Sequence, residues 1–177
     1  MQQLISWIRD WRGHLVFWLG AIAVGLVSVL FAVSASRAEH WHAAFIERHG
    51  LLAMLITPLG LMAIAYLTRR FCPGAQGSGI PQTIAALKTT ENRLRRQLLS
   101  FRIAFAKVAL TLLGFLSGAS IGREGPTVHV GASILFALGN RVRFPHHYLD
   151  HALILAGGAA GISAAFNTPM AGVLFAI

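Results

Sequence analysis

The stretch Gly-Arg-Glu-Gly-Pro-Thr-Val-His-Val-Gly-Ala, residues 122–132, is a polar segment in a chain that is otherwise strongly apolar. Glycines on both sides of an Arg-Glu pair, followed by a proline, are typical of a tight turn that leads into a helix. A helix start carries free backbone N–H groups and the positive end of the helix dipole, so it can hold an anion. Glu124 would then lie where such an anion binds.

The composition indicates a membrane protein. The 177 residues are 55% hydrophobic and only 12% charged, with a mean hydropathy of +0.63, whereas soluble domains carry about 25% charged residues. The net charge of +9 does not indicate nucleic-acid binding, because no basic run is interleaved with aromatic residues expected to be exposed. Basic residues in such a chain mark cytoplasmic loops, and the expected partner is the lipid bilayer.

The cysteine and histidine pattern indicates neither a metal site nor a cofactor. Cys72 is the single cysteine, so no internal disulfide is possible. The pairs His40 and His42, and His146 and His147, fall in expected loops without the carboxylate and histidine spacing of a metal-binding helix. The first apolar run is too long for a cleavable signal peptide, so we expect it to stay in the membrane.

The N-terminal third predicts an interfacial helix followed by the transmembrane domain. Residues 1–13 mix tryptophan, leucine and isoleucine with charged residues, a pattern typical of an amphipathic helix at the cytoplasmic membrane surface. The predicted transmembrane domain is 14–177. Residues 14–36 are almost uncharged and long enough to cross a hydrocarbon core of about 30 Å.

A second spanning helix is predicted for residues 50–67, interrupted by Pro58. Between the two spans, residues 37–49 are polar and balanced in charge, which favours a loop or a short interfacial helix. The second span ends in Arg69 and Arg70, on the same side as the arginines near the N-terminus. The positive-inside rule makes that side, and the N-terminus, cytoplasmic.

A helix too short to span the membrane follows. Residues 72–81 are rich in glycine and proline, and residues 81–89 form a helix of only two turns before the basic segment 91–97. The turn at 77–79 would therefore begin a half-helix inside the membrane. Backbone groups at that depth must be buried in protein or face water or a bound ligand.

Residues 98–116 predict the third long helix, with Lys107 in its interior. Two interpretations of Lys107 remain open: a buried cation near an anion path, or a long side chain that reaches a cavity or the interface. After the glycine-rich turn, residues 126–138 predict a second helix that starts at membrane depth.

The C-terminal part is built from small residues. A polar loop at 139–147 precedes a predicted helix at 148–156, and the small residues of 157–165 permit close packing between helices. Residues 167–169 should break that helix and open another at 171–177. A spanning helix cannot stop after two turns, so we expect further residues after Ile177.

Three stretches in this order resemble the CLC family of chloride channels and proton-coupled chloride transporters. They are Gly-Ser-Gly-Ile-Pro at 77–81, Gly-Arg-Glu-Gly-Pro-Thr-Val at 122–128, and the segment from Gly-Ala-Ala-Gly at 158–161 to Phe-Asn-Thr-Pro-Met-Ala-Gly at 166–172. The resemblance implies an all-α polytopic membrane protein with tilted, discontinuous helices arranged as an inverted repeat. It also implies a homodimer, most of whose first repeat is this chain, located in a bacterial inner membrane.

The resemblance also implies residue roles. Ser78 would donate its hydroxyl to a central chloride, backbone amides at the helix starts would contribute to selectivity, and Glu124 would be the gate and the proton-carrying group. Chloride and protons are thus the implied solutes, with no cofactor, metal or enzymatic activity. The implied anion-binding set is Ser78, Gly79, Ile80, Gly122, Arg123, Glu124 and Gly125, and the helix-breaking residues are Pro81, Pro126, Asn167 and Pro169.

Two departures from the family pattern leave this site intact. Gln82 stands where many transporters have glutamate, and His129 where glutamine is common, but neither supplies the groups invoked above. Serine at position 78 resembles the chloride-preferring members, since nitrate-preferring members have proline there.

Several alternatives stay open from the sequence. Glu124 and Arg123 could form a structural ion pair, and Ser78 could be only an N-cap. The choice between a proton-coupled exchanger and a voltage- or pH-gated channel depends on residues after Ile177. An intramembrane hydrolase using Ser133 and His129, or a structural membrane protein without transport, are the alternatives from other classes.

Overall fold

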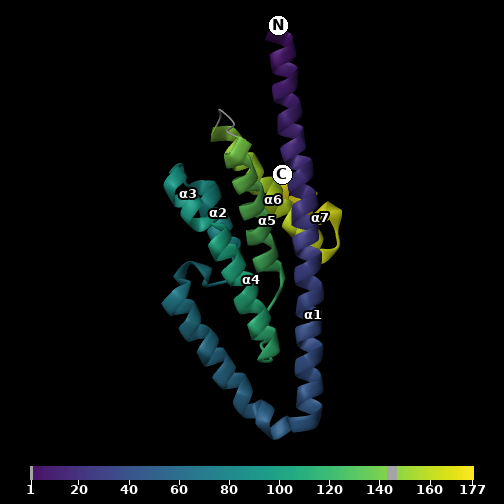
Figure 1. Cartoon of the computed structure of the whole chain (residues 1–177), viewed down its shortest axis with the longest axis vertical. Coiled ribbons are helices and arrows are strands. Elements are labelled where there is room, and N and C mark those ends of the chain that lie inside the picture. Colours follow the sequence, from purple (N-terminus) through teal and green to yellow (C-terminus); the bar gives the residue numbers. More distant parts are fainter. Residues whose placement is uncertain (1, 143–146) are drawn as a thin grey trace.

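The chain folds entirely into helices in the part that the computed structural model describes, residues 2–142 and 147–177 (Figure 1). This confirms the predicted all-α class. The elements in order are α1 Gln2–Phe71, the 3-10 turn η1 Pro73–Ala75, α2 Ile80–Lys88, α3 Asn92–Leu98, α4 Phe101–Leu116, α5 Glu124–Val142, α6 His147–Phe166 and α7 Pro169–Ala176.

Helix α1 has two arms joined at His49, whose backbone is non-helical with φ −139° and ψ 47°, and Figure 1 shows the chain reversing direction there. A loop at residues 37–49 was therefore the wrong alternative, because the first arm stays helical up to the kink. No glycine or proline occurs between Gly25 and Gly50, and polar, charge-balanced residues are good helix formers. The first arm therefore ends only at His49, directly before Gly50.

Pro58 does not interrupt the second arm, contrary to the sequence-based expectation. A proline in a helix removes one backbone hydrogen bond and strains the preceding turn. In an apolar segment the remaining hydrogen bonds have no competing water, so the helix continues through the proline.

Two described stretches, Leu15–Phe71 and Asn92–Leu116, are long and apolar enough to cross a membrane. The first stretch covers part of the first arm of α1 and all of the second, with the predicted span at 50–67 and all but the first residue of the predicted span at 14–36. The chain is helical from Gln2, but its side chains before Leu15 lie outside those described, so the interfacial role of residues 1–13 remains a prediction.

Helix α2 matches the short helix predicted before the basic segment, and the boundaries of the neighbouring helices differ. Helix α2 corresponds to the expected 81–89. The expected helix 98–116 is divided at Ser100, whose hydroxyl accepts a hydrogen bond from the Ile103 amide at 3.2 Å and caps α4. Helix α5 continues to Val142, into the loop expected at 139–147, and residues 143–146 lie outside the described residues.

Helix α5 is the central element of the fold. It packs against α6, α1, α4 and α2, and every residue from 125 to 136 is buried. A helix that is buried all round must be apolar or small on every face, which explains the composition of this segment. The turn at its N-terminus is thereby fixed from several sides.

Small residues allow α6 to lie directly on α5. A Cβ added at Gly161 would lie 2.7 Å from the Thr127 carbonyl oxygen, and one added at Gly157 would lie 2.7 Å from the Gly131 carbonyl carbon. This confirms the close packing predicted for residues 157–165. Helix α6 runs through these small residues to Phe166, beyond the stretch expected at 148–156, and ends at the break expected for residues 167–169.

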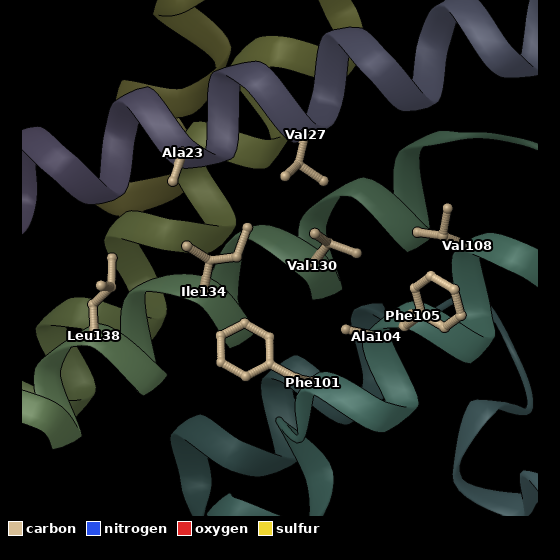
Figure 2. A pocket seen from close by; sticks show the side chains of 9 residues that line it. All are labelled: Ala23, Val27, Phe101, Ala104, Phe105, Val108, Val130, Ile134 and Leu138. Carbon is tan, nitrogen blue, oxygen red and sulfur yellow. The ribbon is translucent and has the colours of Figure 1, made fainter.

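An apolar pocket of about 440 Å³ lies between α1, α4 and α5 (Figure 2). Its walls offer no hydrogen-bond donor, so it is suited to hydrocarbon and not to an anion. An ion site must be sought at the helix starts instead. The lining residues are Ala23, Val27, Phe101, Ala104, Phe105, Val108, Val130, Ile134 and Leu138.

Candidate functional site

The turn before α2 depends on two glycines. Gly77 has φ 72° and Gly79 has φ 108°, values in the left-handed region that side chains disfavour. They flank Ser78, which is exposed. Gly79 is the N-cap of α2 and Pro81 is the second residue of that helix. Amides in the first turn have no intrahelical acceptor, so the missing N–H of proline costs no hydrogen bond there.

Helix α5 also carries a proline in its first turn. Helix α5 begins at Glu124 and carries Pro126 as its third residue. The Thr127 amide and hydroxyl both donate to the Arg123 carbonyl oxygen, at 3.2 Å and 2.7 Å. Thr127 is therefore the first residue of α5 whose amide is paired within the helix. The amides before it have no intrahelical acceptor.

These two helix starts touch each other. A Cβ added at Gly125 would lie 2.7 Å from Ser78 Cβ and 2.8 Å from the Ser78 carbonyl carbon. A Cβ added at Gly79 would lie 2.8 Å from the Gly125 carbonyl oxygen. The structure thus brings together the Ser78 and Glu124 segments, which lie more than forty residues apart in the sequence, with no room for a side chain between them.

Free amide groups gather at this junction. Among the described backbone hydrogen bonds, the first intrahelical donor of α2 is Thr83 and that of α5 is Thr127. The amides of Ile80, Glu124 and Gly125 have no backbone acceptor there. Unpaired N–H groups at two adjoining helix starts, each with a positive dipole end, form an arrangement that favours a negative charge.

Glu124 and Arg123 point in different directions. The Glu124 side chain folds back over Gly122, where its carboxylate occupies the space that a Cβ would need. Arg123 reaches α1, where it donates to Ser36 Oγ at 3.2 Å and to the Ala32 carbonyl oxygen at 3.4 Å, and lies 4.0 Å from a Glu39 carboxylate oxygen. The described ion pairs of the chain do not include one between Glu124 and Arg123.

Two further groups flank Gly79 from the interior. His129 is fully buried and its Nε2 lies 2.9 Å from the Leu98 carbonyl oxygen. Lys107 is 2% exposed and its Nζ donates to the carbonyl oxygens of Gln76 and Gly77. Of the two interpretations of Lys107, the structure supports the buried cation.

The geometry does not assemble a serine hydrolase. Ser133 is fully buried, and its Oγ has no hydrogen-bond partner among the described residues. His129 uses its Nε2 for a backbone carbonyl on another helix. A nucleophile must be reachable and paired with its base, and Ser133 meets neither condition.

The remaining helix-breaking residues lie at the end of α6. Asn167 has φ 52°, the left-handed conformation that asparagine tolerates best among residues with side chains. Pro169 is the first residue of α7, which packs against α6. Glycine or asparagine in the left-handed region thus precedes α2, α5 and α7, and each of these helices has a proline in its first turn.

The arrangement of the helices indicates a class of membrane protein. Long apolar helices combined with helices that begin at glycine-rich turns and are too short to span are typical of helical membrane channels and transporters.

Comparison with known proteins identifies the family. The chain belongs to the family described as "Voltage gated chloride channel", which its residues 59–177 match. This family consists of channels and transporters and not of enzymes, and the chain is accordingly a chloride-transport-family membrane protein.

The chain is also similar to curated bacterial relatives. It is 33% identical over 180 residues to the H(+)/Cl(-) exchange transporter ClcA of Citrobacter koseri, and 34% identical over 184 residues to that of Klebsiella pneumoniae subsp. pneumoniae. Each alignment covers 96% of this chain and 37% of the relative. The chain therefore spans little more than a third of the length of these relatives.

Sequence reasoning identified the two turns but missed what joins them. The contact between Ser78 and Gly125 and the anchoring of Arg123 on α1 were not anticipated. One signal was present: a glycine directly after Glu124, inside a helix, lowers helix propensity without being needed for a turn. Such a glycine indicates a close backbone approach.

Proposed function

We propose that the protein containing this chain moves chloride across a membrane, and that chloride binds at the joined starts of α2 and α5. The observation that carries this proposal is the contact between Ser78 and Gly125, because it gathers free amides of both helices and an exposed hydroxyl. Partial charges suit this task, since each contributes on the order of 1 kcal/mol and the ion can leave again. A full positive charge would hold chloride too tightly.

In this proposal Glu124 acts as a competing anion. Ionised, its carboxylate occupies the anion's place beside the free amides; protonated, it loses that attraction and moves away. The partial exposure of Glu124 and the engagement of Arg123 with α1 support this role, because a carboxylate held in an ion pair would not be free to move.

Proton-coupled exchange is the preferred form of transport. The relatives from Citrobacter koseri and Klebsiella pneumoniae are described as H(+)/Cl(-) exchange transporters, and a glutamate that alternates between ionised and protonated forms supplies one step of such a cycle. The proposal includes the inverted repeat, the homodimer, the cytoplasmic N-terminus and a bacterial inner membrane. A gated channel is the alternative within the same family.

The test uses protein expressed from the complete gene and reconstituted into vesicles. Chloride efflux and proton uptake are measured together, for the unchanged protein, Glu124→Gln and the control Glu91→Gln, which alters an exposed carboxylate at the start of α3. We expect Glu124→Gln to abolish proton movement while chloride still passes, and Glu91→Gln to change neither. Proton coupling that survives Glu124→Gln would refute the role of Glu124, and absence of chloride flux in the unchanged protein would refute the function.

Ser78→Pro provides an independent measurement of the site. Proline removes both the hydroxyl and the amide N–H at this position, so we expect nitrate to gain relative to chloride in the same vesicles. An unaltered ranking of the two anions would place the ion elsewhere.

A further inference from the structure

The Lys107 ammonium is a buried charge without a carboxylate. Its residue is 2% exposed, and the described ion pairs join Arg95 to Asp150 and Arg123 to Glu39, so neither involves Lys107. A buried cation is costly unless its donors are satisfied. Here the partners are backbone oxygens of the turn before α2.

Lys107 reaches that turn by passing beside Gly79. A Cβ added at Gly79 would lie 3.3 Å from Lys107 Cδ, so the stem of the side chain packs against the N-cap of α2. Its Nζ then donates to the Gly77 carbonyl oxygen at 2.9 Å and to the Gln76 carbonyl oxygen at 3.3 Å. The side-chain amide of Gln82 also donates to the Gln76 oxygen. Two successive carbonyl groups are thus held toward the interior.

The direction of these carbonyls sets the direction of two amides. In a trans peptide the C=O of one residue and the N–H of the next point opposite ways, and the structure contains no cis peptide among the described residues. With the Gln76 and Gly77 oxygens turned to Lys107, the N–H groups of Gly77 and Ser78 point away from it. Both residues are exposed, and neither amide donates to a described backbone acceptor.

We propose that Lys107 is a positioning residue for anion binding: its ammonium fixes the Gln76 and Gly77 peptide groups so that the Gly77 and Ser78 amides face the bound anion. The proposal rests on the proposed function and adds a part to it. Lys107 does not touch the anion. The peptide groups of this glycine-flanked turn have two opposite orientations, and Lys107 selects the one that presents amides. The other orientation would present carbonyl oxygens, which repel chloride.

The role of a positioning residue differs from that of a fixed charge. A buried charge raises anion affinity whatever groups line the site, so its effect would be the same in any background. If Lys107 acts by orienting an amide, its effect on anion affinity requires that this amide be present. Ser78→Pro removes the Ser78 N–H, and the effect of changing Lys107 should shrink in that background.

The experiment measures chloride binding to the complete purified protein by isothermal titration calorimetry, with nitrate as the competing anion. Lys107→Met keeps the length of the stem without donors, Lys107→Arg keeps donors and charge, and Arg102→Met is the control, because it removes an exposed cation from the same helix. Since one amide hydrogen bond to an ion is lost, we expect Lys107→Met to raise the chloride Kd about tenfold. We expect Lys107→Arg to stay within about threefold of the unchanged protein, and Arg102→Met to have no effect.

The double variant Ser78→Pro with Lys107→Met decides between positioning and charge. We expect its Kd to exceed that of Ser78→Pro alone by less than about threefold, because the interaction between contacting groups is not additive. If Lys107→Met does not fold, Lys107→Gln, which keeps one donor without the charge, is compared in both backgrounds.

The outcomes separate this proposal from the function on which it rests. A chloride Kd that is unchanged in Lys107→Met, or a loss of the same size with and without Ser78→Pro, would overturn the positioning role while leaving chloride binding established. Failure of the unchanged protein to bind chloride would overturn both.

Discussion

Replacing Gly125 with alanine is the most direct test of how the site is built. The added Cβ would lie 2.7 Å from Ser78 Cβ and 2.8 Å from the Ser78 carbonyl carbon. Ordinary van der Waals contact begins near 3.4 Å, and the Ser78 carbonyl oxygen would lie nearer still, so the two helix starts must separate by at least about 0.7 Å. The carbonyl carbon belongs to the backbone and cannot rotate aside.

The consequence for anion binding follows from hydrogen-bond geometry. An ion that bridges amides of both helices would lose one set after such a separation, because a donor–acceptor distance lengthened by about 0.7 Å falls outside hydrogen-bonding range. Loss of one amide bond to an ion costs about 1.5–3 kcal/mol, which raises Kd by at least about tenfold. We therefore expect Gly125→Ala to bind chloride at least about ten times more weakly.

The effect on stability is expected to be smaller. Overpacking in a tight contact costs about 1–3 kcal/mol, while replacing glycine by alanine in a helix returns up to about 1 kcal/mol. A net destabilisation of about 1–2 kcal/mol should lower the unfolding temperature. A protein destabilised by this amount stays folded, so the expected increase in the chloride Kd must come from the altered site and not from unfolding.

Gly25→Ala is the matched control, because a Cβ at Gly25 in α1 meets nothing within 4 Å. It should raise the unfolding temperature and leave the chloride Kd unchanged. Titration calorimetry and thermal unfolding of both variants provide the comparison. If Gly125→Ala binds chloride like the unchanged protein and gains stability like Gly25→Ala, the two helix starts are not in the contact described and the reasoning is wrong.

Two other substitutions test the surroundings of the site. Gly157→Ala should destabilise the fold by about 1–3 kcal/mol, because its Cβ would lie 2.7 Å from a backbone carbon of α5; an unfolding temperature equal to that of the unchanged protein would contradict the packing of α6 on α5. Glu39→Gln should change stability by less than about 1 kcal/mol, since the side chains of Arg123 and Glu39 are 39% and 46% exposed and lie 4.0 Å apart. A larger shift in thermal unfolding would show that this ion pair, and not the Ser36 hydrogen bond, anchors Arg123.

Short-range chemistry made several features predictable. The long apolar runs specified membrane helices, and glycine or asparagine with proline marked the starts of α2, α5 and α7, because these residues act on their own backbone wherever the chain folds. The same local reasoning failed for residues 37–49 and for Pro58. Polarity was taken as evidence for a loop, although helix continuity depends on propensity and on the absence of competing water.

The candidate site was predictable as a set of residues and not as an arrangement. The turn containing Ser78 and the turn containing Glu124 were each identified from their own sequence. That Gly125 lies against Ser78, and that Arg123 extends to α1 and away from Glu124, depends on which helices α5 packs against. Such contacts join residues far apart in the chain, so no local pattern specifies them.

Lys107 shows most clearly what the sequence determines and what the tertiary structure determines. By itself the sequence determined that a lysine lies in the middle of an apolar helix, and that its charge must find a partner. Only the tertiary structure decided that the partners are the carbonyl groups of Gln76 and Gly77. The physical reason is that a charge specifies the need for compensation, whereas the packing of α4 beside the turn before α2 determines which atoms can supply it.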